Sequence, residues 1–259
     1  MLGLMQDWPL LCHRIIEHAA QIHGTQEVVT RSVEGPIHRT NYKEIHDRAL
    51  KVSQRLDRDG IKLGDRVATI AWNTWRHLEA WYGIMGIGAI CHTVNPRLFP
   101  EQIAWIINHA QDRALFFDID LASLVEKLAP LCPGVRAWVA LSDSAHAAVA
   151  GIPGLLCYED LLEAGSETFD WPEFDENQAA CLCYTSGTTG NPKGALYSHR
   201  SIILHSYAAA LPDALSISVR DVALPIVPMF HVNAWGIPYI ATLVGCKLVL
   251  PGPALDGAN

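Results

Sequence analysis

The sequence predicts an α/β fold in which mainly parallel sheets carry helices on both faces. Segments with a strand pattern alternate with segments with a helix pattern along most of the chain, which is typical of parallel strands joined by helical crossovers. Half of the 259 residues are hydrophobic, which is enough for a large buried core. Only 18% of them are charged, which argues against disorder.

The first elements follow from capping signals and periodicity. Asn41 followed by Glu44 is a capping-box start, and apolar residues then recur at spacings of three and four until Gly60 ends the helix. Beyond Gly60, short apolar runs predict strands and amphipathic runs predict helices. The predicted strands are 66–71, 89–94, 114–117 and 135–141, and the predicted helices are 74–86, 101–110 and 121–128.

The same alternation resumes after residues 142–153, which are rich in Ala, Ser and Gly and predict a surface connection. A strand at 180–185, a glycine-rich loop, a helix at 201–210, a strand at 222–227, a helix from about Asn233 and a strand at 247–250 are expected. Their crossovers should be right-handed. We expect residues 1–165 to form a first α/β subdomain, and residues 166–259 to begin a second that carries the glycine-rich loop.

The last predicted strand is followed only by a loop, Leu250-Pro251-Gly252-Pro253, and by no closing element before Asn259. A sheet that stops after a strand leaves an unpaired edge or an open layer. We therefore expect the fold to be incomplete and the chain to be a portion of a longer protein.

Charge and hydropathy narrow the function classes. A formal net charge of −8 opposes nucleic-acid binding, so a phosphate-bearing ligand must be held by local donors. The N-terminus has no basic segment typical of a signal peptide, because Asp7 and Pro9 interrupt it. The longest apolar runs are shorter than the roughly 20 residues of a membrane-spanning helix. These features favour a soluble cytoplasmic protein.

The seven cysteines form no CxxC pair. Cys181 and Cys183 are two residues apart, which in a strand places them on one face. Free buried thiols in a reducing compartment are the main interpretation. Zinc binding is the alternative, although no His/Cys pair has the usual ligand spacing.

One segment carries the strongest chemical signal: Tyr184-Thr185-Ser186-Gly187-Thr188-Thr189-Gly190-Asn191-Pro192-Lys193-Gly194. Its glycines allow backbone N–H groups to approach a ligand closely, and successive N–H groups form an anion-binding nest. The hydroxyl groups add donors for the oxygens of a polyphosphate, and Lys193 supplies a mobile positive charge. The segment predicts a phosphate-binding loop after a strand.

There are three alternatives to a phosphate-binding loop of this kind: a Walker A motif, a flexible linker and a dinucleotide-binding fingerprint elsewhere in the chain. The loop is not a Walker A motif, because Pro192 precedes Lys193 and Gly194 follows it. A flexible linker would also be rich in Gly, Ser and Thr, but it would not need the preceding strand or the lysine. Gly86 and Gly88 partly match a dinucleotide fingerprint, yet they precede a strand, so close helix–sheet packing explains them better.

Two motifs together resemble the adenylate-forming superfamily of acyl-CoA synthetases, luciferases and peptide-synthetase adenylation domains. Residues 184–194 resemble its phosphate-binding signature. Pro228-Met229-Phe230-His231-Val232-Asn233-Ala234-Trp235-Gly236 resembles its next motif, in the form found in fatty-acyl-CoA synthetases. The stretches 196–200 and 248–255 fit the same branch. The likeness covers nearly the whole chain and is greatest to bacterial medium-chain fatty-acid–CoA ligases, with methylmercaptopropionate–CoA ligases as near relatives.

This resemblance implies roles for individual residues. Thr185 would help to hold Mg²⁺, His231 and Val232 would line the site where the acyl adenylate forms, and Trp235 would gate an apolar tunnel for the alkyl chain. Considered alone, His231 and Trp235 are also explained as packed core residues. The residues expected to bind the ATP phosphates are Thr185, Ser186, Gly187, Thr188, Thr189, Gly190 and Lys193.

The implied function is that of an AMP-forming acid–thiol ligase that uses ATP, Mg²⁺ and coenzyme A. A carboxylate would attack the α-phosphate of ATP, and the coenzyme A thiol would then displace AMP. The first step needs positioning and charge neutralisation instead of a general base, because a fatty acid is ionised at pH 7. The family's adenine, ribose, magnesium-glutamate, hinge and catalytic-lysine motifs are not found before Asn259, so we expect these residues alone to be inactive.

Three alternatives stay open at this point. The acid could be methylmercaptopropionate or an aromatic acid, since most tunnel walls are expected downstream. The chain could be a truncated binding or dimerisation module without catalytic activity. A kinase-type nucleotide binder is disfavoured because the Walker lysine–hydroxyl pair is missing. The resemblance also allows a homodimer, which composition does not show.

Overall fold

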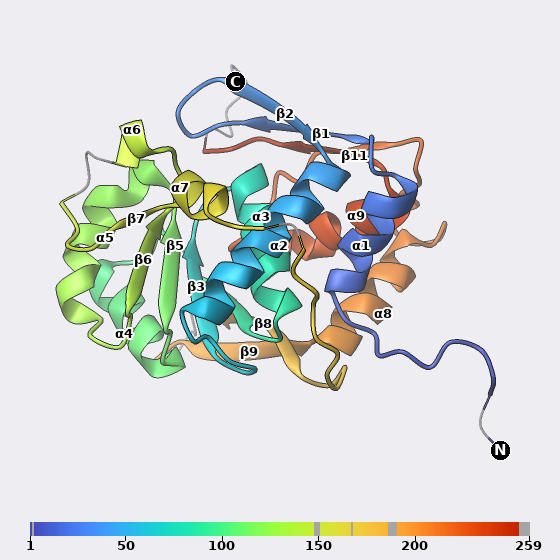
Figure 1. The fold of residues 1–259 in the computed structure, drawn as a ribbon, viewed down its shortest axis with the longest axis horizontal. Coiled ribbons are helices and arrows are strands. Elements are labelled where there is room, and N and C mark those ends of the chain that lie inside the picture. The colour runs from blue at the N-terminus through green and yellow to red at the C-terminus, as the bar shows by residue number, and fades with distance from the viewer. Residues whose placement is uncertain (2, 148–150, 167, 186–190, 254–259) are drawn as a thin grey trace.

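The computed structural model describes residues 1–259 except residues 2, 148–150, 167, 186–190 and 254–259. Its described strands form two sheets (Figure 1). The larger sheet has seven strands in the order β7-β6-β5-β3-β4-β8-β9, and only its edge strand β9 is antiparallel to its neighbour. The smaller sheet has four strands in the order β10-β11-β1-β2, of which β2 is antiparallel.

The strands are short and mostly buried. The larger sheet consists of β3 (Arg66–Ile70), β4 (Ile90–Thr93), β5 (Ala114–Phe117), β6 (Ala137–Ala140), β7 (Leu156–Cys157), β8 (Ala179–Thr185) and β9 (Lys193–Ser198). The smaller sheet consists of β1 (Glu27–Arg31), β2 (Ile37–Asn41), β10 (Val222–Ala223) and β11 (Lys247–Leu250).

The helices fill the space between and beside the sheets. The α-helices are α1 (His13–Ile22), α2 (Tyr42–Arg58), α3 (Trp75–Gly86), α4 (Pro100–Ala110), α5 (Ala122–Leu128), α6 (Ser144–Ala147), α7 (Tyr158–Glu163), α8 (His199–Ala210) and α9 (Ile237–Val244). The 3₁₀ turns are η1 (Ile119–Leu121), η2 (Ala129–Leu131) and η3 (Val232–Gly236). None of the helices in the described part of the chain is both long and apolar enough to cross a bilayer.

Two hydrophobic clusters show that the larger sheet is covered on both faces. On one face, Ile103 and Ile107 of α4 pack with Val125 and Leu128 of α5. On the other face, α1, α2, α3 and α9 contribute to a larger cluster that also includes Val28 and Leu248 of the smaller sheet. Helix α3 is buried along its whole length. The predicted α/β class, with mainly parallel strands and helices on both faces, is confirmed.

Local sequence signals placed several elements correctly. The side chain of Asn41 accepts a hydrogen bond from Glu44 N, as the capping box predicts, and Thr74 caps α3 in the same way through His77 N. Strands β5 and β11 have the predicted bounds. Elements α1, β1, β2, β7, α7 and β9 were not predicted.

Other segments differ in part from the expectations. Each sheet contains strands from both sides of residue 165, and the division of the chain at that residue stays a prediction. In the expected surface connection 142–153, residues 144–146, 151 and 153 are exposed, although the connection also includes α6 and buries Ile152. Strand β11 is not an edge strand, because it pairs with both β10 and β1. The strand expected at 222–227 ends at Ala223, since Pro225 has no N–H for a ladder and Asn73 binds the carbonyls of Pro225 and Val227.

Candidate functional site

The base of the glycine-rich loop is a β-hairpin. Strands β8 and β9 run antiparallel, and Thr185 pairs with Lys193, so the two ends of the loop lie one strand spacing apart. The hydroxyl of Thr185 donates to the carbonyl of Lys193 at 3.4 Å, a weak contact that leaves its oxygen lone pairs free. Both side chains are exposed. Five further predicted residues, Ser186, Gly187, Thr188, Thr189 and Gly190, lie outside the described residues.

Tyr184 anchors this hairpin to α4. Its hydroxyl is 2.6 Å from Nδ1 of His109, whose ring stacks on Trp105 with centroids 4.6 Å apart. Burial raises the pKa of Tyr184, so the phenol stays protonated at neutral pH. Because side chains alternate along a strand, Tyr184 and Thr185 point to opposite faces of the sheet.

The second motif meets the hairpin on the Thr185 face. Cys183 lies on the same face as Thr185, and its thiol donates to Oδ1 of Asn233 at 3.1 Å. Thr93 Oγ1 is also 3.2 Å from this sulfur. Burial raises the pKa of Cys183 to about 12, which keeps it a neutral thiol. The structure therefore brings the η3 turn to the face of the sheet on which Thr185 lies.

The η3 turn has an unusual backbone. Val232, Asn233, Ala234 and Trp235 all have φ between 49° and 56°, in the left-handed region. Each non-glycine residue held there costs roughly 1–2 kcal/mol, and a β-branched residue such as Val232 is a clear outlier. Such strain persists only where surrounding contacts fix it, and it concentrates at functional sites. The helix expected from Asn233 begins instead at Ile237, after this turn.

The turn separates buried from exposed side chains. Asn233 and Ala234 are buried, whereas Trp235 is 58% exposed and Val232 is 43% exposed. His231 is exposed as well, and its backbone N–H donates to the carbonyl of Pro228 at 2.9 Å. The explanation of His231 and Trp235 as packed core residues is therefore wrong. All three predicted acyl-site residues lie together on one exposed turn.

Asn73 fixes the segment that leads into this turn, and the sequence analysis did not identify it. Its side-chain amide donates to the carbonyls of Pro225 at 2.8 Å and Val227 at 3.0 Å, and its Oδ1 accepts from Met229 N at 2.6 Å. Asn73 is only 3% exposed and follows the carboxyl end of β3. That position, a polar residue after a buried strand, was the available signal.

A cation and two aromatic rings border the same segment. Phe230 meets the ring of Trp72 edge-on at 5.9 Å, and the guanidinium of Arg97 lies 5.7 Å from the Phe230 centroid and 5.9 Å from the Trp72 centroid. Lys193 forms no hydrogen bond or ion pair through its ammonium group within the described ranges. The site thus offers the positive charge of Arg97 beside two aromatic rings and that of Lys193 on the exposed end of the hairpin.

The sequence of the chain matches one family over most of its length. The sequence pattern of the AMP-binding enzyme family matches residues 16–258, and the chain belongs to that family. It is 51% identical to a medium-chain-fatty-acid–CoA ligase of Ectopseudomonas oleovorans over 100% of this chain and 47% of that protein. It is 50% identical to a 3-methylmercaptopropionyl-CoA ligase of Ruegeria lacuscaerulensis, over 99% of this chain and 48% of that protein.

The chain spans about half the length of the curated relatives it matches. The fold also matches the crystal structure of an anthranilate–CoA ligase in complex with anthranoyl-AMP, with a TM-score of 0.86. That match covers 98% of this chain and 47% of the other, at 20% identity, and thus concerns the fold alone.

Proposed function

We propose that this chain forms part of an AMP-forming acid–thiol ligase that activates a fatty acid, with a medium-chain acid as the preferred substrate. One observation supports this most directly. The hairpin that carries the hydroxyl- and glycine-rich loop shares a sheet face with the strained turn that follows His231. A polyphosphate on the loop would thus lie beside an acid bound at the turn, which is what transfer between the two requires.

The proposed reaction has two steps. An oxygen of the carboxylate attacks the α-phosphorus of ATP, the bond to the bridging oxygen breaks, and pyrophosphate leaves. The thiol of coenzyme A then loses its proton to solvent and its sulfur attacks the acyl carbon. The bond from this carbon to the bridging anhydride oxygen breaks, and AMP leaves with that oxygen. The protein contributes by positioning the two substrates and by neutralising charge that develops on the phosphate oxygens.

The described residues suit these tasks. The exposed ammonium of Lys193 can follow the β- and γ-phosphates, and the hydroxyl of Thr185 can offer one oxygen to Mg²⁺. A single protein oxygen suits Mg²⁺, because this ion commonly takes its other ligands from water and substrate phosphates. When bound, the ion would shield the charge of those phosphates. Ser186, Gly187, Thr188, Thr189 and Gly190 are proposed to donate to the phosphates as well.

The acid end is proposed to lie at His231, Val232 and Trp235. Exposed apolar side chains at Val232 and Trp235 give an alkyl chain a surface to contact, and His231 can hydrogen-bond a carboxylate or acyl phosphate. The 3-methylmercaptopropionyl-CoA ligase at 50% identity supports a short thioether acid as a second candidate substrate. We further propose a cytoplasmic location, which suits the seven cysteines being free, and a homodimer.

Acid-dependent exchange of labelled pyrophosphate into ATP, measured on the full product of the gene, tests the proposal. The acids should run from acetate to palmitate and include methylmercaptopropionate and benzoate. Exchange that peaks with medium-chain acids supports both the mechanism and the substrate. Exchange with only one other acid keeps the mechanism and replaces the substrate. If no acid promotes exchange, the chain is better explained as a non-catalytic binding module.

A further inference from the structure

A concave site away from the hairpin and the η3 turn lies between the β1–β2 turn and the segment that follows β6. It has a volume of about 690 Å³, and none of its lining residues belongs to β8, β9 or η3. Its lining includes five carboxylates and only three permanently basic side chains, so the local field favours a cation. Ser32 also lines it, is 5% exposed, and has a buried hydroxyl without a partner in the described part of the protein.

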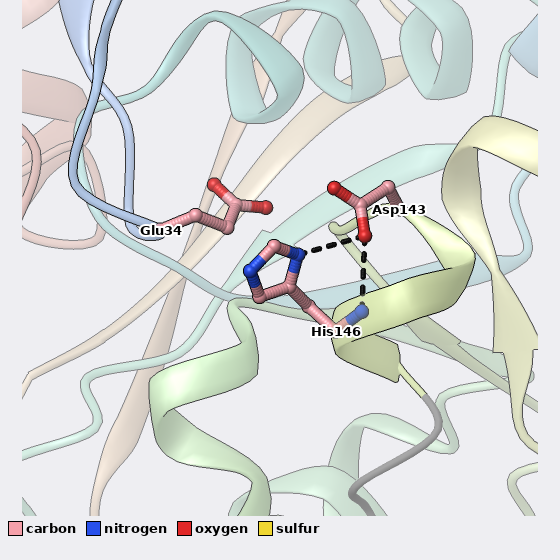
Figure 2. Close-up of side chains that lie close together, drawn as sticks. All are labelled: Glu34, Asp143 and His146. Carbon is pink, nitrogen blue, oxygen red and sulfur yellow. Dashed lines mark hydrogen bonds and ion pairs between the residues drawn. The ribbon is translucent and has the colours of Figure 1, made fainter.

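Three side chains of this site can offer ligand atoms to one ion. Glu34, Asp143 and His146 place one such atom each within 4.8 Å of the others. Figure 2 shows the carboxylates of Glu34 and Asp143 flanking the imidazole of His146. Glu34 comes from the β1–β2 turn and His146 from α6, so the group joins the chain after β1 to the chain after β6.

Asp143 sets the orientation and tautomer of His146. Its Oδ1 is 2.7 Å from Nδ1 of His146 and accepts from the backbone N–H of His146 at 3.0 Å. These two hydrogen bonds fix the carboxylate of Asp143 beside the ring of His146. A carboxylate only accepts, so Nδ1 carries the proton and Nε2 keeps a lone pair. Metal-binding histidines are commonly oriented by a carboxylate in this way.

Glu34 is held from the other side. Arg76 Nη1 donates to its Oε1 at 2.6 Å, and the hydroxyl of Ser142 donates to the same oxygen at 3.2 Å. Within the described part of the chain no hydrogen bond to Oε2 is found, so this oxygen can serve as a ligand. The side chain is 8% exposed, and Arg76 is fixed in turn by Glu159 at 2.7 Å. The carboxylate is thus oriented before an ion arrives, and Arg76 neutralises only part of the pocket's negative charge.

We propose that Glu34 Oε2 and His146 Nε2 bind a divalent transition-metal cation of the Zn²⁺ or Co²⁺ type, with Asp143 as the residue that orients His146. Mixed nitrogen and carboxylate donors suit these ions, whereas Mg²⁺ prefers oxygen alone. Ligands around a tetrahedral Zn²⁺ are about 3.4 Å apart for bonds of about 2.1 Å. Asp143 and His146 are both about half-exposed, so the pair can shift together toward Glu34 to reach that spacing, and water completes the coordination. The bound ion ties the two sheets together.

The test is calorimetric titration of the chelator-treated protein with Zn²⁺ alone. One equivalent should bind per chain, and thermal unfolding should shift upward with added Zn²⁺. His146→Gln should weaken binding at least 100-fold, and Asp143→Asn about tenfold, since it removes only the orienting partner. His205→Gln, an exposed histidine outside this pocket, is the matched control and should bind as the parent protein does. The side chains of His146 and Asp143 are about half-exposed, so the variants at these two positions should fold.

Three results would overturn the proposal: no Zn²⁺ binding by the parent protein, unchanged binding by His146→Gln, or an equal loss in the His205→Gln control. A spectrum of the Co²⁺-loaded protein separates this site from the cysteines. It should lack the thiolate-to-cobalt charge-transfer band, and a strong band of that kind would place the ion on sulfur instead. Displacement of Zn²⁺ by an equal concentration of Mg²⁺ would exclude the histidine ligand.

Discussion

The two segments of the candidate site are held in place by different means. The hairpin β8–β9 is positioned by strand pairing, and its functional side chains Thr185 and Lys193 point into solvent. The segment 225–236 is positioned by buried side chains from elsewhere, Asn73 above all, and its backbone is strained. The difference indicates that the backbone of the hairpin is fixed by its own strand pairing, whereas the backbone of the segment 225–236 depends on side chains from elsewhere. Four changes test this contrast, from the largest expected effect to the smallest.

Asn73→Ala should give the largest effect. It leaves two carbonyls and one N–H unpaired in a buried place, and each such group costs about 1–3 kcal/mol, so we expect a loss of about 4 kcal/mol in the free energy of unfolding. Urea unfolding measures it. Asn95→Ala, which removes one exposed contact to Arg97 N, is the control and should change stability by less than about 0.5 kcal/mol. A similar small change for Asn73→Ala would show that the segment is held by other contacts.

Acidification should weaken the end of the hairpin where β9 enters α8. Burial lowers the pKa of His199 to about 4, and its Nδ1 accepts from Cys12 N. Between pH 6.5 and 4 the unfolded chain binds a proton that the folded chain does not, so stability is complete above pH 6.5 and falls toward pH 4. One such group accounts for about 3 kcal/mol, and His13 and His77 act in the same direction.

The variant His199→Asn measures how much of the acid-induced loss of stability is due to His199. Its amide oxygen can still accept from Cys12 N, but it does not titrate. The loss of unfolding free energy from pH 6.5 to pH 4 should therefore be smaller in this variant than in the parent protein. An identical loss in both proteins would assign the acid sensitivity to other groups.

Lys193→Ala should separate function from stability. The side chain is exposed, so the free energy of unfolding should stay within about 0.5 kcal/mol of the parent value. Loss of the positive charge should slow acid-dependent pyrophosphate exchange at least about tenfold. A large drop in Tm would contradict the contrast, because it would make this hairpin side chain structural.

Trp235→Ala should have the smallest effect on stability and a selective effect on function. With 58% of the residue exposed, little packing is lost. We expect the preference among acids of different chain length to change several-fold while the KM for ATP stays constant. An unchanged acid profile would argue against contact between Trp235 and the alkyl chain.

Much of the fold was predictable because its signals are local. The cap at Asn41 and the apolar runs of β5 and β11 act within a few residues, so the sequence reveals them directly. The pairing of β9 with β8 was not predicted, since the glycine-rich stretch between them indicated a loop but not the direction of the chain after it. Strand β2 was not predicted either, because its mostly polar sequence has no clear alternation of apolar and polar residues.

The site was predictable in identity but not in geometry. The resemblance named Thr185, Lys193, His231, Val232 and Trp235. The left-handed turn, however, contacts Cys183, 50 residues away from Asn233, and the segment before it is held by Asn73, 156 residues away from Met229. Hydrophobicity alone indicates a buried Trp235, yet the turn exposes it. A backbone fixed by distant side chains cannot be inferred from the residues that adopt it.

The pairing of β1 with β11 has a consequence for synthesis. Val28, Val29 and Thr30 lie in register with Leu248, Val249 and Leu250, so one edge of the β1–β2 hairpin has no partner until the chain has grown past residue 250. At a ribosomal rate of about 5–20 residues per second, the wait is about 10–40 seconds. During that interval an apolar strand with free N–H and C=O groups is open to pairing with other nascent chains. The smaller sheet is thus where chaperone dependence during translation should be sought.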